Sequence, residues 1–251
     1  MVIINKEHIH TIPLLHVVKQ DLIDQRIPLV IFLHGVTSIK ERNMQMAYML
    51  AERGYRVILP DALYHGERSR KMNIYPYFWE VVLNSIEEVK IIKEELEIRS
   101  LIQEGRIGLA GTSMGAITTL GAMGRYDWIT VGVSLMGNPA YMQFAEQQVQ
   151  AMKQMNVEWL NDEQVAKQLD MLKKYDITQN LGQWKERPLM FWHGGRDQVV
   201  PYEAEYAFYE QLKPAYEEKG VPISYIFDEK AGHAVPNSGV VTAVKWFADH
   251  L

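Results

Sequence analysis

The pentapeptide Gly111-Thr112-Ser113-Met114-Gly115 constrains the fold of this chain more than any other feature. An apolar run typical of a short strand, residues 106–110, precedes it, and a run of small and apolar residues typical of a tightly packed helix, residues 116–123, follows it. A serine at such a corner sits on a sharp, strained turn with its hydroxyl exposed above the sheet. Glycine is needed on both sides because the backbone crowds itself there. The pattern therefore predicts a nucleophilic Ser113 at the edge of a sheet.

Length and composition exclude several classes of protein. The chain has 251 residues, of which 47% are hydrophobic and 23% charged, and this fits a single α/β domain over residues 1–251. The net charge of −5 offers no basic surface for nucleic acid. No apolar run reaches membrane-spanning length, and the first eight residues do not resemble a signal peptide. Without cysteine there is neither a disulfide nor a thiol nucleophile. We expect a cytoplasmic protein with no nucleic-acid or membrane partner, and no feature sets an oligomeric state.

Strand and helix signals alternate along most of the chain. Residues 2–10 and 12–19 are typical of a β-hairpin. Further strands are predicted at 29–33, 55–61, 106–110, 131–136, 189–193 and 223–227, and helices at 41–53, 76–101, 116–123, 203–216 and 238–250. Repeated β-α-β units of this kind predict a mostly parallel, doubly wound sheet with helices on both faces. Ligands of such sheets bind at the carboxyl ends of the strands.

Residues 139–187 break this alternation. They contain no strand signal but two helical patterns, 140–155 and 161–174, with many large apolar side chains: Met142, Phe144, Met152, Met155, Trp159 and Leu160. One interpretation is a surface insertion whose methionines fill gaps against the body of the domain. The other is a lid over Ser113, since an excursion of this length in a compact domain is usually functional. The two are compatible, and we expect a helical lid insertion over 139–187.

A nucleophilic serine needs a base, and the base needs an orienting acid. His233 lies in a loop between the last predicted strand and the last helix, and Asp197 lies just past the preceding strand. The order Ser113, Asp197, His233 differs from the orders found in other serine hydrolase lineages. We expect these three to form the catalytic triad. Other carboxylates could serve as the acid: Asp176, Asp228 and Glu229.

The reaction also needs donors for the charge that develops on the carbonyl oxygen. The backbone N–H of Met114 is the first choice, because it follows the nucleophile at a helix N-terminus. The second donor should come from the loop after the first buried strand, where Val36 is expected and Thr37 is the alternative. His34 is expected to hold this loop by a hydrogen bond without taking part in the chemistry.

Several motifs together resemble the α/β-hydrolase superfamily. They are Leu33-His34-Gly35, the pentapeptide around Ser113, the segment from His193 to Pro201, and Gly232-His233. Within that superfamily the chain resembles the serine esterases related to dienelactone hydrolase and the prolyl oligopeptidase-type catalytic domains. The resemblance spans residues 27–250, includes the Asp61 and His65-Gly66 pattern after the next strand, and implies the α/β-hydrolase fold. A dienelactone hydrolase proper would carry cysteine at position 113, and a dehalogenase or epoxide hydrolase would carry aspartate.

We interpret the chain as a serine hydrolase, specifically a carboxylesterase that cleaves small to medium acyl esters through an acyl-enzyme. Ser113 would attack the carbonyl, His233 would transfer the proton, and Asp197 would orient His233. No cofactor or metal is expected, and the partner is a small-molecule ester. The predicted walls of the substrate pocket are Tyr64, Met142, Phe144 and Trp192.

Three alternatives stay open at this point. An acyl-peptide or aminopeptidase-type serine peptidase would use the same triad. A non-catalytic binding protein could use the same scaffold, although such proteins usually lose a triad residue. A metallohydrolase could draw on histidines at one sheet edge, but no H-E-x-x-H motif is present. Those histidines are His34, His65, His193 and His233.

Overall fold

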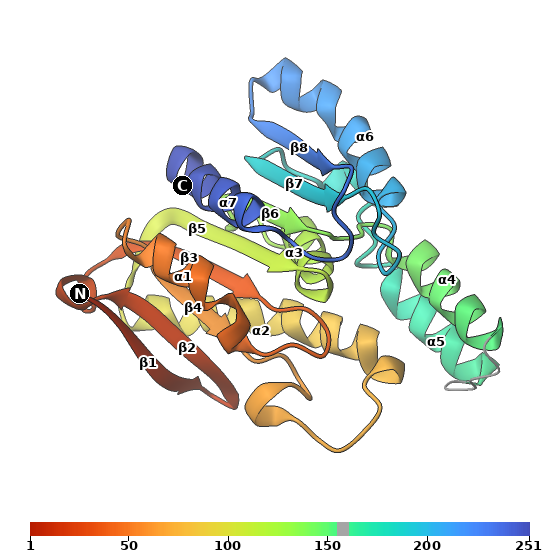
Figure 1. Ribbon diagram of the computed structural model, residues 1–251, viewed down its shortest axis with the longest axis horizontal. Helices are drawn as coiled ribbons and strands as arrows, with labels where there is room; N and C mark the ends of the chain where they lie inside the picture. The colour runs from red at the N-terminus through yellow and green to blue at the C-terminus, as the bar shows by residue number, and fades with distance from the viewer. Residues whose placement is uncertain (155–160) are drawn as a thin grey trace.

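The computed structural model describes residues 1–154 and 161–251, and eight strands in these ranges form one sheet (Figure 1). The strands are β1 (Val2–Ile9), β2 (Ile12–Lys19), β3 (Ile27–Leu33), β4 (Arg56–Pro60), β5 (Ile102–Thr112), β6 (Val131–Leu135), β7 (Leu189–Gly194) and β8 (Ile223–Asp228). Their order is β1-β2-β4-β3-β5-β6-β7-β8. The hairpin β1–β2 is antiparallel and β2 pairs antiparallel with β4, whereas β4, β3 and β5 to β8 run parallel. The predicted mostly parallel sheet is confirmed.

Helices cover both faces of the sheet because side chains alternate along each buried strand. Val30 and Phe32 of β3 belong to a core cluster with residues of α1 (Met44–Ala51) and α7 (Asn237–His250). Their neighbours Leu29, Ile31 and Leu33 belong to a second cluster on the opposite face. That cluster includes residues of α2 (Phe78–Ile98), α3 (Met114–Arg125) and α6 (Glu203–Lys219).

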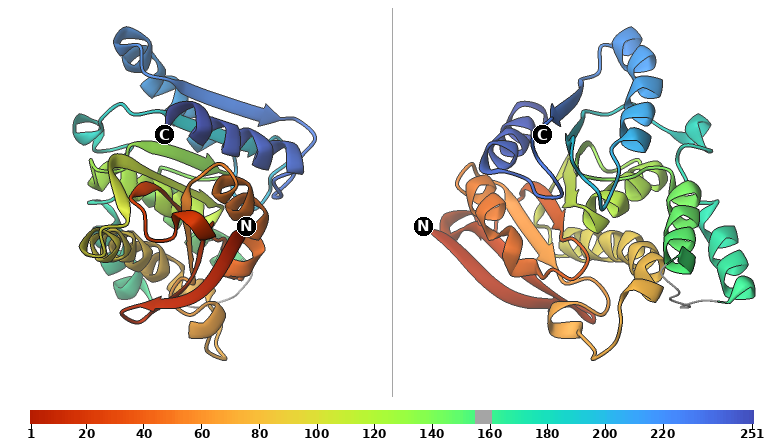
Figure 2. Two further views of the ribbon diagram at one scale, coloured as in Figure 1. Left: turned by 90° about the vertical axis from the view of Figure 1, so that its left-hand side faces the viewer. Right: turned by 45° about the vertical axis from the view of Figure 1, so that its right-hand side comes forward.

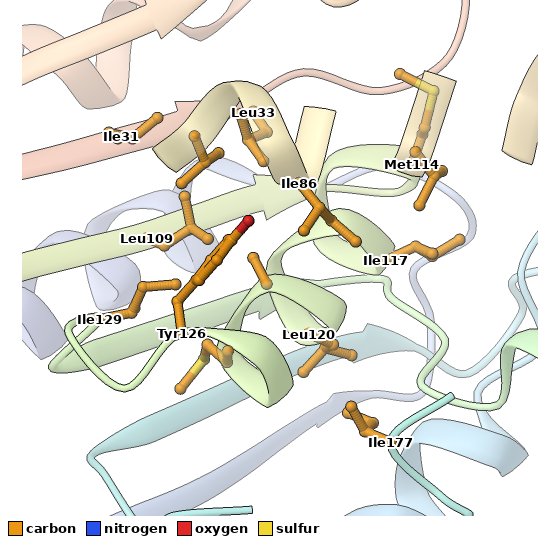
Figure 3. Packing of buried hydrophobic residues seen from close by; sticks show 14 of the residues in the cluster. Ile31, Leu33, Ile86, Leu109, Met114, Ile117, Leu120, Tyr126, Ile129 and Ile177 are labelled. Atoms are coloured by element: carbon orange, nitrogen blue, oxygen red, sulfur yellow. The ribbon is translucent and has the colours of Figure 1, made fainter. Parts of the chain in front are cut away.

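The core around α3 positions the corner at Ser113. Figure 3 shows Ile117 and Leu120 of this helix among buried residues that include Leu109 of β5 and Ile86 of α2. All four side chains are fully buried. Burial of this kind stabilises the folded state by roughly 1.5–3 kcal/mol per large aliphatic side chain. The N-terminus of α3 is therefore held at the carboxyl end of β5.

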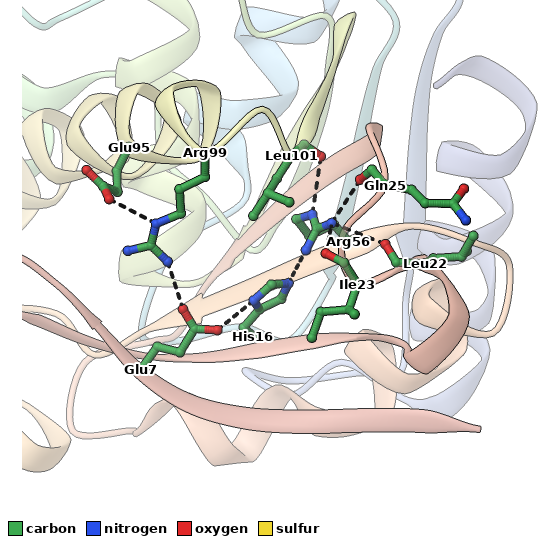
Figure 4. A network of polar contacts seen from close by, with 9 residues as sticks. All are labelled: Glu7, His16, Leu22, Ile23, Gln25, Arg56, Glu95, Arg99 and Leu101. Atoms are coloured by element: carbon green, nitrogen blue, oxygen red, sulfur yellow. Dashed lines mark hydrogen bonds and ion pairs between the residues drawn. The ribbon is translucent and has the colours of Figure 1, made fainter.

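A buried polar network ties the N-terminal hairpin to the rest of the sheet (Figure 4). Arg56 of β4 is fully buried and contacts His16 of β2, whose Nδ1 lies 2.7 Å from Glu7 Oε1 of β1. The guanidinium also donates to the carbonyl oxygens of Leu22, Ile23, Gln25 and Leu101. Burial lowers the pKa of Arg56 to about 10, so it stays charged at neutral pH. The carbonyl ligands replace the water that this charge loses.

Several predicted element boundaries differ from the structure by a few residues, and two of them show a local cause. The helix expected from residue 41 begins as a 3₁₀ turn, η2 (Lys40–Asn43), before α1. Strand β5 begins at Ile102, earlier than expected, because it continues through Gly105, whose φ of +71° favours a residue without a side chain. Four more short 3₁₀ turns lie in connections: η1 (Gln20–Leu22), η3 (Gly66–Arg68), η4 (Tyr75–Tyr77) and η5 (Leu181–Gln183).

The excursion between β6 and β7 contains α4 (Tyr141–Gln154) and α5 (Asp162–Leu172), which lie side by side beyond the carboxyl ends of the strands (Figures 1 and 2). The ring of Phe144 packs against Phe78 and Trp79 at the start of α2, with centroids 6.3 and 6.2 Å apart. Trp79 Nε1 also donates to Gln148 Oε1 at 2.9 Å. Met155, Trp159 and Leu160 lie outside the described residues. The lid role of this excursion stays a prediction.

Candidate active site

Ser113 occupies the strained corner between β5 and α3. Its φ of 55° and ψ of −118° are unfavourable for a residue with a side chain. A Cβ at Gly115 would lie 2.1 Å from the Leu33 carbonyl oxygen, and a Cβ at Gly111 would lie 2.2 Å from the carbonyl carbon of Gly115. Both positions therefore require glycine. The serine is presented by a turn that only this small-residue pattern can form.

Left-handed backbone recurs at the carboxyl ends of four parallel strands. Thr37 follows β3, Tyr64 follows β4, Ser113 follows β5 and Met136 follows β6, with φ values of 59°, 62°, 55° and 62°. Each such non-glycine residue costs on the order of 1–3 kcal/mol unless its surroundings hold it in place. Strain of this kind concentrates where a fold builds a functional site, and here it follows one edge of the sheet.

The side chains of Ser113, His233 and Asp197 are connected by hydrogen bonds. His233 Nδ1 lies 2.7 Å from Asp197 Oδ2, and His233 Nε2 lies 2.8 Å from Ser113 Oγ. A carboxylate can only accept, so Nδ1–H donates to Asp197 and Nε2 accepts from the serine hydroxyl. The carboxyl group of Asp197 is fully buried, while the His233 side chain is 23% exposed. This geometry suits proton transfer from serine to histidine.

Asp197 is held as a carboxylate. Burial alone would raise its pKa, but hydrogen bonds from His193, His233 and the backbone outweigh this effect and hold the pKa well below its usual range. The N–H groups of Val199 and Val200 donate to Oδ1 at 2.9 and 3.0 Å. The same turn therefore fixes the carboxylate and leaves Oδ2 to face His233.

Two of the three alternative acids, Asp176 and Asp228, have other partners. Asp176 accepts from the Met142 N–H at 2.9 Å and from the Thr178 hydroxyl at 2.5 Å, so it caps the start of α4. Asp228 accepts from the Lys230 N–H at 3.0 Å in the turn after β8. In the described part of the chain, the carboxylate hydrogen-bonded to His233 is that of Asp197.

Two histidines connect the loops that follow β3 and β4. His34 Nε2 accepts from the Ala62 N–H at 3.0 Å, and its Nδ1 donates to the Gly35 carbonyl at 2.8 Å. His65 Nδ1 donates to the Leu63 carbonyl at 2.8 Å. Burial lowers the pKa of His34 to about 4 and also lowers that of His65, so both are neutral at pH 7. The expected loop-holding hydrogen bond of His34 is confirmed.

The two expected oxyanion donors belong to segments next to Ser113. Met114 begins α3, and Val36 lies in the loop after β3 and lines the cavity at Ser113. A Cβ at Gly35 would lie 3.5 Å from Ser113 Cβ, so this loop and the serine corner are in contact. The alternative donor is occupied, because the Thr37 N–H donates to His65 Nε2 at 3.1 Å.

A cavity of about 490 Å³ opens beside Ser113 and His233. Its apolar lining includes Phe32, Met46, Leu135, Met136, Val235 and Val240. Its polar lining includes Thr37, Ser38, Arg42, Asn43 and Gln45. Among the described residues, the buried Asn43 Nδ2 has no hydrogen-bond partner. The cavity can therefore hold a small substrate with both apolar and polar parts.

The structure places the four predicted pocket residues outside this lining. Phe144 and Trp192 are core residues, 6% and 2% exposed, and lie in the clusters on opposite faces of the sheet. Tyr64 donates its hydroxyl to Glu80 at 2.8 Å, and Met142 is partly buried against the core. A pocket role for these residues stays a prediction, and for Phe144 and Trp192 the observed role is packing.

Sequence reasoning assigned no role to the buried ion pair of Lys40 and Asp61, which joins the segments after β3 and β4. Lys40 is 1% exposed, and its ammonium donates to Asp61 at 2.5 Å and to Glu67 at 2.7 Å. Asp61 also accepts from the Lys40 N–H at 3.1 Å. The sequence gives a hint of Asp61, because this residue lies in the family-like motif after β4. It gives none of Lys40, which lies in a polar run typical of a solvent-exposed surface.

The described residues contain no group of three or more histidine, aspartate or glutamate side chains arranged to hold a metal ion. Both ring nitrogens of His34 and of His65 are committed to hydrogen bonds within the protein. In the same ranges, no helix has the length and apolar character needed to cross a membrane.

Comparison with known proteins places the chain among serine hydrolases. Residues 42–251 match the prolyl oligopeptidase family. Over 255 aligned residues the chain is 44% identical to YitV of Bacillus subtilis (strain 168), a candidate esterase, and all of both chains is covered. It is 29% identical to the esterase YjfP of Escherichia coli (strain K12), again over all of both chains. The crystal structure of TT1662 from Thermus thermophilus shares the fold, with a TM-score of 0.78 and 22% identity over 99% of this chain and 98% of that chain.

Proposed function

The chain belongs to the prolyl oligopeptidase family of serine hydrolases, and from this premise we propose that it is a carboxylesterase whose catalytic triad is Ser113, His233 and Asp197. The observation that carries the proposal is the pair of hydrogen bonds, 2.8 and 2.7 Å long, that joins these three side chains at a strained serine corner. The two relatives that match over their full length carry esterase names.

In the proposed reaction, Ser113 Oγ attacks the ester carbonyl carbon while its proton passes to His233 Nε2. The N–H groups of Val36 and Met114 stabilise the negative charge that forms on the carbonyl oxygen. The carbon–oxygen bond to the alcohol then breaks, and His233 returns the proton to that leaving oxygen. Water, deprotonated by His233, then attacks the acyl-enzyme; the bond between the acyl carbon and Ser113 Oγ breaks, His233 returns the proton to Oγ, and the acid is released. Asp197 stays ionised throughout and stabilises the histidine cation.

The cavity beside Ser113 indicates a small or medium ester. A volume of about 490 Å³ holds a short acyl chain, and its apolar lining suits a hydrocarbon part. Arg42 in the polar lining would bind a polar or anionic group on the same substrate. We further propose that residues 139–187 act as a lid that adjusts acyl preference. A chain without cysteine suits a reducing compartment, which supports a cytoplasmic location.

Labelling with a fluorophosphonate probe, which reacts with activated serines, tests the nucleophile. The wild-type protein should gain one label, and Ser113→Ala should lose it together with ester turnover. Ser38→Ala, which removes another hydroxyl from the same cavity, should still be labelled. A label that persists on Ser113→Ala would show that the nucleophile is misassigned.

The acid and the substrate class are tested separately. Asp197→Asn should lower kcat by roughly 10⁴-fold with the fold retained, because His233 loses its tautomer control. Asp176→Asn should keep most of the activity, since that carboxylate caps α4. Matched p-nitrophenyl esters and p-nitroanilides of the same acyl group should be cleaved with a strong preference for the ester. A preference for the anilide would instead favour a peptidase.

A further inference from the structure

A second histidine lies directly behind the acid of the proposed triad. His193 of β7 is fully buried, and its Nε2 lies 3.5 Å from Asp197 Oδ2. The same nitrogen lies 2.9 Å from the Val200 carbonyl oxygen. On the other side of the ring, Nδ1 lies 2.6 Å from Oε2 of Glu205, which is fully buried in α6. A histidine–glutamate pair thus continues the line from Ser113 through His233 and Asp197 into the core.

The partners of this pair assign its protons. The Val200 carbonyl can only accept, so His193 Nε2 must carry a hydrogen. Glu205 Oε1 accepts from the Ser134 hydroxyl at 2.5 Å and from the Gly137 N–H at 3.1 Å, and these donors stabilise a carboxylate. We therefore assign the proton between Nδ1 and Oε2 to His193, which makes His193 a cation and Glu205 a carboxylate.

The electrostatics of His193 agree with this assignment. Burial by itself would lower the pKa of His193, but the carboxylates of Glu205 and Asp197 outweigh it and raise the pKa to about 10. Burial in turn raises the pKa of Glu205, against the effect of His193. We favour the ion pair. Both the protonated and the ionised form of Glu205 can accept hydrogen bonds from Ser134 and Gly137, but these bonds stabilise the ionised form more strongly.

A buried ion pair adds little net stability to a folded protein. Removing two charges from water costs several kcal/mol, and well-packed apolar residues often stabilise a core as much or more. The chain shows the contrast in His16 and Glu7, where the glutamate is 25% exposed and the pair lies in the N-terminal hairpin. The His193–Glu205 pair is instead fully buried and abuts a proposed catalytic carboxylate.

We propose that His193 and Glu205 are positioning residues, which keep Asp197 ionised and aimed at His233 during turnover. Because the cation of His193 stabilises the carboxylate, Asp197 does not take the proton when His233 becomes an imidazolium. Ser134 and Gly137 support Glu205, so strand β6 contributes to the site although it carries no triad residue. The inference rests on the proposed triad and names how its acid is held.

Glu205→Gln tests the charge with little change of shape. The amide cannot hold the His193 cation, so His193 becomes neutral while its Nε2–H still donates to Val200. We expect kcat to fall by about tenfold, a small part of the roughly 10⁴-fold cost of losing the acid. KM should stay unchanged. The acid limb of the pH profile, where kcat/KM falls as the pH is lowered, should move to higher pH by about half a unit. The reason is that the loss of the His193 positive charge favours protonation of the base.

Ser134→Ala is the milder companion variant. It removes one donor from Glu205 and should shift kcat and the acid limb in the same direction, by less. Glu7→Gln is the matched control, because it removes the carboxylate of the His16–Glu7 pair, which lies in the N-terminal hairpin. It should change the melting temperature without moving kcat or the acid limb.

An Asp197→Asn background separates positioning from general damage. If Glu205 acts through Asp197, adding Glu205→Gln to Asp197→Asn should not slow fluorophosphonate labelling of Ser113 any further. Unchanged kcat and acid limb in Glu205→Gln would overturn the inference even if the melting temperature falls. If Glu205→Gln does not fold, the same readouts on Ser134→Ala decide. A wild-type protein without ester turnover would instead count against the proposed function.

Discussion

His65 Nε2 accepts a hydrogen bond from the backbone N–H of Thr37 at 3.1 Å, and the two residues are 28 positions apart in the chain. The reciprocal bond runs from the Ala62 N–H to His34 Nε2, also 28 positions apart. Each histidine thus holds the loop to which the other belongs. Because the Thr37 donor is occupied, Val36 stays the proposed oxyanion donor of the loop after β3.

His65→Leu should disturb the proposed oxyanion hole without touching the proposed triad. Thr37 loses its acceptor, the loop after β3 loosens, and the Val36 donor moves away from the developing charge. Loss of one such donor costs roughly 10²-fold or more in kcat, and a misplaced donor should cost about tenfold or more. His65→Gln should restore part of kcat, since its amide oxygen can accept from Thr37. Steady-state kinetics with one ester would refute this if both variants matched the wild type.

Gly115→Ala should disrupt the contact between the serine corner and β3. The new Cβ would lie 2.1 Å from the Leu33 carbonyl oxygen, so the backbone must shift and both esterase activity and melting temperature should fall. Gly182→Ala is the control, because a Cβ there meets nothing within 4 Å. Its unfolding free energy should stay within about 0.5 kcal/mol of the wild type. Equal effects of the two substitutions would argue against a close-packed corner.

Stability should depend on pH through His34. Its pKa is about 4 in the folded protein against 6.5 for an ordinary histidine, so the unfolded chain binds more protons between these values. Stability is therefore present above pH 6.5 and lost as the pH falls toward 4, by about 3 kcal/mol from this residue.

Denaturant unfolding at several pH values checks this expectation. The dependence between pH 6.5 and 4 should be shallower in His34→Gln, which has no titrating ring, and unchanged in His8→Gln, whose histidine is exposed. Parallel curves for wild type and His34→Gln would contradict the burial argument.

The proposed lid should act through Met142. Met142→Ala should change the ratio of kcat/KM between longer and shorter acyl esters by about fivefold, which is roughly 1 kcal/mol of lost apolar contact. Met171→Ala in α5 is the control, because that side chain is 54% exposed. Phe144→Ala should instead lower the unfolding free energy by about 3–5 kcal/mol, since it removes a core ring. An unchanged ratio in Met142→Ala would argue against the lid and indicate that the excursion is a structural insertion without a role in acyl preference.

The fold was largely predictable because its signals are local. The run Leu29 to Leu33 is apolar at every position, as expected of a strand covered on both faces, and Gly54 ends the helical region before β4. Small residues around Ser113 predict the corner partly for the same reason, because a Cβ at Gly111 would crowd Gly115, a close neighbour in sequence. Gly115 is instead confined by Leu33 of β3, a contact that only the fold shows. The position of the excursion between β6 and β7 was harder to predict, because an apolar helical pattern does not show which surface the helix covers.

The supporting residues of the site could not be predicted in the same way. Glu205 lies in a helix with acidic neighbours, and only the folded sheet shows that it is buried against His193. Phe144 and Trp192 are large apolar side chains that suit a core as well as a pocket, and sequence does not distinguish the two. Long-range contacts decide both cases.

The proposed base follows the nucleophile by 120 residues. At roughly 5–20 residues per second, a ribosome needs about 6–24 s to add that length of chain. During this time the emerging polypeptide carries the serine corner and the loops after β3 and β4 but lacks His233, and Asp197 is added only in the last part of the interval. The serine hydroxyl therefore has no base until β8 and the loop after it have been synthesised. The nascent chain is expected to have no esterase activity before that point.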